Sequence, residues 1–298
     1  TRRMPRIDQL SGVELAAAMD SANGTQRDLF QQQIQWTHDM TAVAGLRKLA
    51  VESPRAEVRV QAISTWANLE SPAVDVLERL MADSDPHVRR HAVRISESQL
   101  RTSPELSAAF MRLAADEDDA VRLQVAYSSA FLQPVDGAKS LATLLAADNV
   151  NVHLMSAIES SLSSENIVPV ISQLKVLSSQ NAALDRLILD AATLADSAAL
   201  KSILAELSDA VLDASTDEGR SAAAISRLAS FVEAWSRRAE HGLPPGSDAM
   251  RAIWKPAMDA AVRIVESEDS STNLRAAAIR LVAEGQFLGE PHTESLAG

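Results

Sequence analysis

The sequence predicts an all-α fold and, within that class, an α-solenoid in which antiparallel helix pairs stack one on the next. Two observations indicate this. A helix start followed by one amphipathic helix recurs with a period of about thirty residues, which is the signature of stacked helical repeats. The composition agrees, because 46% of the 298 residues are hydrophobic and only 3% aromatic, with Ala, Leu and Val predominant. Ala and Leu are also strong helix formers.

The repeated phrase is clearest at residues 83–95, which spell Asp-Ser-Asp-Pro-His-Val-Arg-Arg-His-Ala-Val-Arg-Ile. Further copies lie at residues 55–69, 116–130 and 148–162 and, in weaker form, near Asn23 and Ser271. Each strong copy carries apolar residues at the spacing of one helical face. Two helices per period cannot bury such faces alone, so the pairs must stack.

Start signals divide the first half of the chain into helices. Ser11 and Glu14 form a capping-box pattern that opens a short helix. A cap residue followed by Pro favours a first helical turn, and this signal occurs at Ser53-Pro54, Ser71-Pro72, Asp85-Pro86 and Ser103-Pro104. We expect helices over residues 11–20, 25–36, 39–52, 55–69, 72–82, 86–95, 104–115, 116–130, 135–147 and 148–162.

The repeats become irregular after residue 163. We expect helices from just before Pro169 to Ser178 and over residues 182–194, 198–212, 220–240, 250–267 and 274–286, with Asp196 as a cap. The turn-rich segment 241–247 lengthens one loop. Since no linker of domain scale is visible, we expect a single solenoid over residues 1–298. Its regular repeats cover about 23–162 and its irregular repeats 163–288.

Charge and composition exclude several classes of protein. The formal net charge of −12 argues against a general nucleic-acid binder, which needs a basic patch. Residues 102–218 hold 6 Lys or Arg against 17 Asp or Glu, whereas residues 47–101 hold 9 against 8, so the basic side chains concentrate early in the chain. No run of apolar residues is long enough for a membrane span. The absence of Cys excludes disulfides, thiolate metal sites, cysteine nucleophiles and c-type haem attachment.

A family resemblance follows from the repeated phrase. Asp-x-Asp-Pro-x-Val-Arg-x-x-Ala, at residues 83–92, resembles the second helix of a HEAT repeat, which implies an armadillo-type superhelix of helix pairs. Phrases at residues 23–28, 88–97 and 273–281 further resemble the HEAT-repeat section of large secreted planctomycete and verrucomicrobial proteins described as membrane-bound dehydrogenases. In those proteins a β-propeller of sugar-dehydrogenase type precedes the repeats and a c-type cytochrome domain follows them.

That second resemblance implies a periplasmic or secreted location and redox chemistry in neighbouring domains. Without it, a cytoplasmic location is the expectation. Because this chain has no Cys, and hence no Cys-x-x-Cys-His, neither haem nor redox activity transfers to its own residues. We expect no cofactor.

Three arginines, Arg59, Arg89 and Arg122, follow the first core valine of successive copies. They could form a ladder that binds a partner. The HEAT resemblance implies instead that each pairs with a turn aspartate of the adjacent repeat, and we favour this structural role. The expected partners are Asp83 or Asp85, Asp116 or Asp119, and Asp148. His153 takes the arginine's place in the fourth copy, so the ladder should weaken there.

Other polar groups carry little chemistry. His87 and His91 are four residues apart, but the intervening residues lack the Glu of a His-Glu-x-x-His zinc motif. The acids at residues 116–119 lack the spacing and Gly of an EF-hand and suit a helix N-terminus. No Gly-x-Ser-x-Gly elbow and no Gly-rich phosphate loop occurs. Arg90 and Arg94, one helical turn apart, are not explained by packing and form a basic spot suited to an acidic partner.

The sequence therefore predicts a non-catalytic scaffold for protein–protein interaction, or a spacer between domains, in a larger multidomain protein. Its partner is another protein or an adjacent domain of the same polypeptide. Two alternatives stay open. The chain could be the non-catalytic part of a secreted dehydrogenase and cytochrome c assembly, or a HEAT-like enzyme such as a lyase or DNA glycosylase, although the acidic charge opposes the last.

Overall fold

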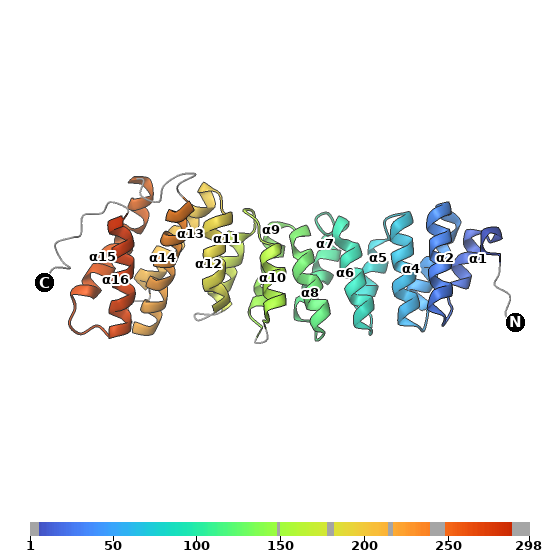
Figure 1. The fold of residues 1–298 in the computed structure, drawn as a ribbon, viewed down its shortest axis with the longest axis horizontal. Helices are drawn as coiled ribbons and strands as arrows, with labels where there is room; N and C mark the ends of the chain where they lie inside the picture. Colours follow the sequence, from blue (N-terminus) through green and yellow to red (C-terminus); the bar gives the residue numbers. More distant parts are fainter. Residues whose placement is uncertain (1–5, 148–149, 178–181, 214–216, 239–247, 288–298) are drawn as a thin grey trace. The chain divides into compact units, whose positions relative to one another are not determined.

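The structure, a computed structural model, describes residues 6–147, 150–177, 182–213, 217–238 and 248–287. Across these ranges the chain forms helices α1 to α16, joined by turns and short 3₁₀ segments, and has no β-strand (Figure 1). The prediction of an all-α fold is thus confirmed. No helix in these ranges combines the length and apolar character that crossing a bilayer requires.

The chain divides into two compact units. Unit 1 comprises Thr1–Leu144 and Val150–Ser161, and unit 2 comprises Leu145–Asn149 and Leu162–Gly298. The prediction of one continuous solenoid over residues 1–298 concerns the join between these units and stays a prediction.

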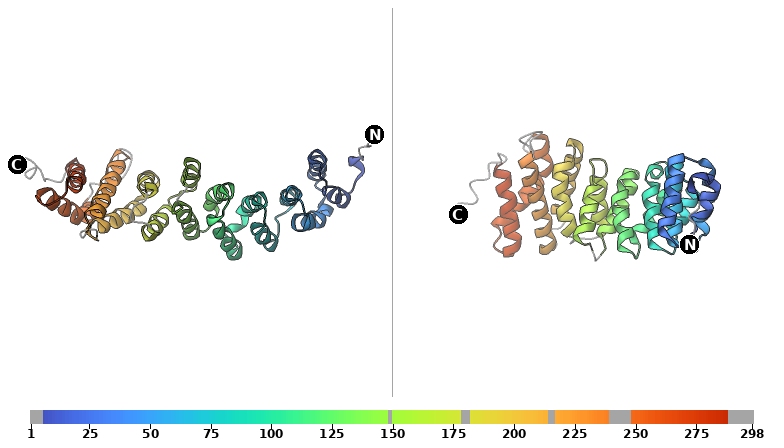
Figure 2. Two further views of the ribbon diagram at one scale, coloured as in Figure 1. Left: turned by 90° about the horizontal axis from the view of Figure 1, so that it is seen from below. Right: turned by 45° about the vertical axis from the view of Figure 1, so that its right-hand side comes forward.

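Unit 1 is built from antiparallel pairs. The first helices of the pairs are α1 (Gly12–Ala18), α3 (Val43–Glu52), α5 (Val74–Met81), α7 (Pro104–Arg112) and α9 (Pro134–Leu145). The second helices are α2 (Gly24–Thr37), α4 (Ala56–Leu69), α6 (Pro86–Leu100), α8 (Asp119–Ser128) and α10 (Val152–Ser160). Second helices contact one another in order from α2 to α10, and first helices do so from α1 to α7. The result is two layers of parallel neighbours, seen nearly end-on in Figure 2 (left).

The apolar face predicted for the second helices is the one that unit 1 buries. Val58 and Ala62 of α4, Val88 and Ala92 of α6, and Val121 of α8 are all fully buried. Small residues bring neighbouring helices of one layer close: a Cβ on Gly45 of α3 would lie 2.8 Å from the Cβ of Ala16 in α1. Close packing of short apolar side chains explains why so few aromatic residues suffice.

Polar caps fix where these helices begin. The carboxylate of Asp85 accepts the backbone N–H of His87 at 2.9 Å, and Pro86 occupies the first turn of α6. Asp118 accepts the N–H groups of Ala120 and Val121 in the same way at the start of α8. The capping box of Ser11 and Glu14 is also present, as predicted. These caps satisfy N–H groups that a helix start leaves unpaired.

Two predicted helix starts are wrong. The first turn of α4 begins at Ala56 and that of α5 at Val74, so Ser53-Pro54 and Ser71-Pro72 lie before the helices. The hydroxyl of Ser53 donates to Asp20 at 3.1 Å and accepts the N–H of Arg55. The carbonyl of Pro72 accepts a bond from Gln99 of α6. Both dipeptides are thus used to anchor turns, and tertiary contacts override the local start signal.

Unit 2 repeats the arrangement with longer helices. Its members are α11 (Ile167–Leu177), α12 (Ala182–Leu194), α13 (Ser197–Asp213), α14 (Glu218–Arg238), α15 (Asp248–Glu266) and α16 (Thr272–Phe287). The odd-numbered and even-numbered helices form two layers. Large aromatic side chains enter this core: Phe231 and Trp235 are buried with ring centroids 5.8 Å apart, and Trp254 is buried on α15. The predicted cap at Asp196 is present, accepting the N–H of Ala199.

Candidate functional site

The ladder arginines of α4 and α6 form two bidentate ion pairs with the turn that precedes the next second helix. Arg59 donates from Nε and Nη2 to the carboxylate of Asp83, at 2.9 and 2.7 Å. Arg89 donates in the same way to Asp116, at 2.7 and 2.8 Å. The Arg89 and Asp116 side chains are only 9% and 6% exposed. Paired donors facing a carboxylate in this geometry give a strong, directional contact.

The same arginines also hold the turn in front of their own helices. In each arginine the third nitrogen, Nη1, donates to a backbone carbonyl. Arg59 donates to the carbonyl of Ser53 at 2.9 Å, and Arg89 donates to the carbonyl of Asp83 at 2.9 Å. Arg122 of α8 donates to the carbonyl of Asp116 at 2.6 Å. The guanidinium groups of Arg59 and Arg89 therefore each tie together two successive turns, whereas that of Arg122 holds only the turn before its own helix. Asp83 and Asp116 each receive bonds from two repeats.

The electrostatics of the second pair follow from this geometry. Hydrogen bonding to Asp116 raises the pKa of Arg89 above its usual value. For Asp116, burial acts to raise the pKa, but the bonds from Arg89 and from the N–H of Asp118 outweigh it. The pKa of Asp116 is therefore below its usual value, and the carboxylate is ionised at neutral pH.

The other predicted members of the ladder lie elsewhere. Asp85 caps α6 instead of meeting an arginine. Asp119, which is mostly exposed, pairs with Arg122 of its own helix and not with an arginine of a neighbouring repeat. Asp148 lies outside the described residues. His153, at the arginine's place in α10, is exposed.

One arginine of this kind was missed from the sequence. Arg27 of α2 donates to the carbonyl of Ser21 at 2.8 Å, six residues earlier, as Arg59 and Arg89 do to theirs. The signal was its place one residue after Gln26, which aligns with the core valines. The copy near Asn23 is weak, with polar Gln26 where the strong copies have Val, and Arg27 was not included among the ladder arginines. Arg275 on α16 likewise donates to the carbonyl of Ser267.

Arg90 and Arg94 have a different environment. Both side chains are exposed, on the side of α6 away from the first helices. Within the described residues, neither arginine makes a hydrogen bond or ion pair in the structure. Two uncompensated positive charges one helical turn apart are thus presented to solvent by an otherwise acidic protein.

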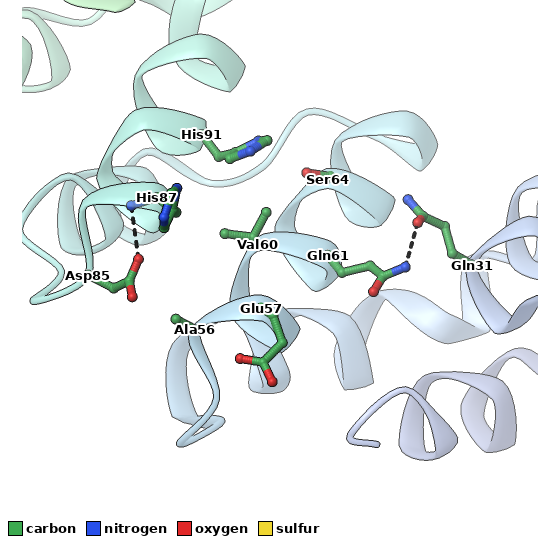
Figure 3. A pocket seen from close by; sticks show the side chains of 9 residues that line it. All are labelled: Gln31, Ala56, Glu57, Val60, Gln61, Ser64, Asp85, His87 and His91. Atoms are coloured by element: carbon green, nitrogen blue, oxygen red, sulfur yellow. Dashed lines mark hydrogen bonds between the residues drawn. The ribbon is translucent and has the colours of Figure 1, made fainter. Parts of the chain in front are cut away.

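Beside them, α2, α4 and α6 enclose an open hollow of about 560 Å³. Figure 3 shows His87 and His91 of α6 on one side of this space and Val60 and Ser64 of α4 on the other, with Gln61 directed toward Gln31 of α2. Gln61 is held in place by its amide, which donates to Gln31 at 2.8 Å and to Asp28 at 2.9 Å. Glu57 and Asp85 line the end near the helix starts. The hollow is therefore polar, with acids at one end and imidazoles beside the two arginines.

His91 reports the positive potential of this region. Its pKa is lowered by burial first, and then by the charges of Arg90, Arg94 and His87. A neutral imidazole here can donate or accept a hydrogen bond. Among the described residues there is no cluster of three or more His, Cys, Asp or Glu side chains suited to a metal ion. The hollow itself therefore offers hydrogen-bonding groups, and the free positive charges lie beside it, on Arg90 and Arg94.

Comparison with known protein families gives a match to part of unit 1. Residues 43–98, which cover α3 to α5 and most of α6, match the family model described as HEAT repeats. That match and the stacked helix pairs together confirm the predicted HEAT-like α-solenoid fold. No curated protein matches the chain. The resemblance to dehydrogenase-type proteins stays a prediction that rests on its three phrases.

Two solved structures of engineered proteins from the Northeast Structural Genomics Consortium are similar over most of their length. One has 13% sequence identity and a TM-score of 0.27, covering 94% of this chain and 98% of its own. The other has 16% identity and a TM-score of 0.26, covering 93% and 97%. Similarities at this level support no inference about function.

Proposed function

We propose that the chain is a non-catalytic scaffold whose second-helix surface in unit 1 holds an acidic segment of a partner protein or of an adjacent domain. The observation that carries this proposal is the contrast on α6: Arg89 is buried and fully engaged, whereas Arg90 and Arg94 are exposed with their charges uncompensated. Arg89 is bonded to the turns of the fold itself, whereas the guanidinium groups of Arg90 and Arg94 are accessible to an external anion.

The physical fit is electrostatic. Guanidinium groups bind carboxylates with paired, charge-assisted hydrogen bonds. Exposed charges attract an oppositely charged partner during approach, although the pull is screened within about 10 Å at moderate salt. A stack of repeats adds many shallow contacts on a preformed surface, as expected for a scaffold and not for an enzyme with one deep pocket.

A charge reversal tests the proposal. We expect Arg90→Glu combined with Arg94→Glu to weaken capture of a fluorescent oligo-glutamate peptide at least about tenfold, which corresponds to about 1.4 kcal/mol. The melting temperature should change little, because both side chains are exposed. Capture is measured by fluorescence anisotropy at low salt and again at high salt, where it should fall.

The matched control reverses two exposed arginines on the first helices, Arg79→Glu with Arg112→Glu, and so gives the same net charge. This control should retain capture. Equal losses in both double variants would mean that the peptide senses only overall charge, which would contradict a site on α6. A joint loss of capture and of stability in the α6 variant would assign Arg90 and Arg94 a structural role instead.

A further inference from the structure

The ladder arginines give a common numbering for the second helices. Counting from Arg59, Arg89 and Arg122, the next residue is Val60, Arg90 or Leu123. The fifth residue after each is Ser64, Arg94 or Tyr127. Because α4, α6 and α8 are successive neighbours in one layer, residues at the same place form rows across them.

Contacts between the helices show which way these rows point. The second residue after a ladder arginine faces the preceding helix, as Gln61 does toward Gln31. The eighth faces the following helix, since Glu97 accepts a bond from Ser128 of α8 at 2.7 Å. Directions around the helix axis can be measured from the ladder arginine, with about 100° for each residue. On this scale the preceding helix lies at about 200° and the following helix at about 80°. The first residue, at about 100°, and the fifth, at about 140°, lie between these two directions. The fifth residue therefore points outward, midway between the two neighbouring helices, and the first residue points outward on the side of the following helix.

The charge and polarity of the residues in the outward rows differ from helix to helix. On α6 they present Arg90 and Arg94, both exposed. On α8 they present Leu123, half-buried, and Tyr127, which is 48% exposed and is the single tyrosine of the chain. On α4 they present the neutral Val60 and Ser64, next to the end of the hollow that holds Glu57. The surface is thus basic in one helix and apolar in the next.

We infer that the acidic segment bound by Arg90 and Arg94 carries an aromatic or large aliphatic side chain that docks on Tyr127 and Leu123 of α8. The inference rests on the proposed function and specifies the partner's chemistry. Tyr and Arg are the residue types enriched at the energetic centres of interfaces. An apolar group seated on α8 would also exclude water beside the arginines and so strengthen their pairing with carboxylates.

The orientation of the segment follows from the charges. Glu57 at the start of α4 and Asp85 at the start of α6 repel an acidic group at that end of the hollow. The carboxylates of the segment therefore lie at Arg90 and Arg94, and its apolar side chain lies over Leu123 and Tyr127 on α8. Packed helices are about 9 Å apart, and an extended chain advances about 3.3 Å per residue. The apolar residue therefore lies about three positions from the acidic pair in a segment that crosses α6 and α8.

Two peptide probes test the inference. One is a short labelled peptide with a Glu-Glu pair among Ser residues. The other is the same peptide with Phe three positions from the pair, prepared with Phe on either side because the direction of the chain is open. We expect one of the two Phe peptides to bind wild-type protein about tenfold more tightly than the Ser peptide. The variant Tyr127→Ser should abolish that gain while retaining affinity for the Ser peptide.

The control variant is Trp36→Ser, which removes another exposed aromatic side chain of unit 1, 79% exposed, from α2. It should leave the Phe gain intact. If Arg90 and Arg94 capture the Ser peptide but Phe adds nothing in either position, this inference fails while the proposed function stands. If wild-type protein captures none of the three peptides, the proposed function itself fails. A Phe gain lost equally in Trp36→Ser would also overturn the assignment to α8.

Discussion

Two regions of unit 1 use arginine in opposite ways. Along the edge formed by the turns, Arg59 and Arg89 are nearly buried and bonded to a carboxylate and to backbone carbonyls. On the outward side of the second helices, Arg90 and Arg94 are exposed and unpaired among the described residues. Arg89 and Arg90 are neighbours in sequence, so residue type does not separate them. Place within the repeat does, because one step around the helix turns the side chain from the turn to solvent.

Unit 2 shows which part of the ladder is general. Arg275 on α16 donates to the carbonyls of Ser267, Glu268 and Ser270, so the arginine again holds the turn before its own helix. The core of unit 2 also contains Trp235 and Trp254, and its ion pairs link helices: Arg227 pairs with Asp185 and Arg280 with Glu233.

The largest expected effect is at the buried ion pair of Arg89 and Asp116. Asp116→Ala removes both carboxylate bonds to Arg89 and leaves this buried guanidinium with only the exposed Glu117, 4.0 Å away, as a nearby counter-charge. We expect a loss of about 3 kcal/mol in the free energy of unfolding. Glu117→Ala is the control. Its side chain is 91% exposed, and it should cost less than about 0.5 kcal/mol. Urea titration followed by circular dichroism measures both variants. Equal losses of unfolding free energy would refute the claim that Asp116 is the stabilising partner of Arg89.

A second comparison separates the two aspartates of one turn. Asp83 receives Arg59, whereas Asp85 caps α6 and bonds no arginine in the structure. We expect Asp85→Ala to cost about 1 kcal/mol, the usual value of an N-cap. Asp83→Ala should cost about 2 to 3 kcal/mol, because it leaves Arg59 unpaired. The same urea titration compares the two unfolding free energies. A larger loss for Asp85→Ala than for Asp83→Ala would contradict the assignment of Asp83 as the more stabilising residue.

The smallest effect concerns pH on the outward side. Burial and the charges of Arg90, Arg94 and His87 lower the pKa of His91 in the folded protein. The unfolded chain therefore takes up this proton first, and stability falls as the pH drops below about 6.5 toward the folded pKa. We expect His91→Gln to reduce this acid-dependent loss by a few tenths of a kcal/mol. Unfolding free energies at pH 7.5 and 5.5 test it, and identical losses in both proteins would contradict it.

Much of the fold followed from local pattern. The spacing of Val58, Val88 and Val121 identified the buried face of the second helices, and Asp85-Pro86 marked the start of α6 correctly. Ser53-Pro54 failed as a start signal because the hydroxyl of Ser53 bonds Asp20 in the turn of the preceding helix pair, a contact that no local rule contains. The periodic spacing of buried residues is visible in the sequence of each helix. The contacts that a turn residue makes depend on the residues that pack against it.

The site was predictable only in part. The sequence singled out Arg90 and Arg94 because the repeats did not explain them, and their exposure agrees with that reasoning. It could not choose between Asp83 and Asp85, because both lie in the same turn and only the direction of the side chain decides. The hollow was not predictable, since it joins Gln31 of α2 to His87 of α6 through the stacking of three helices.

The central claim is that two adjacent arginines on α6 have different roles: Arg89 stabilises the fold, and Arg90 binds the partner. The most direct test makes the same substitution at each, Arg89→Leu and Arg90→Leu, and measures both unfolding free energy and affinity for the Glu-Glu peptide. We predict that Arg89→Leu lowers stability by about 3 kcal/mol and, where still folded, retains the affinity. Arg90→Leu should keep its stability and lose affinity severalfold. A loss of stability at Arg90, or unchanged affinity there, would contradict the claim.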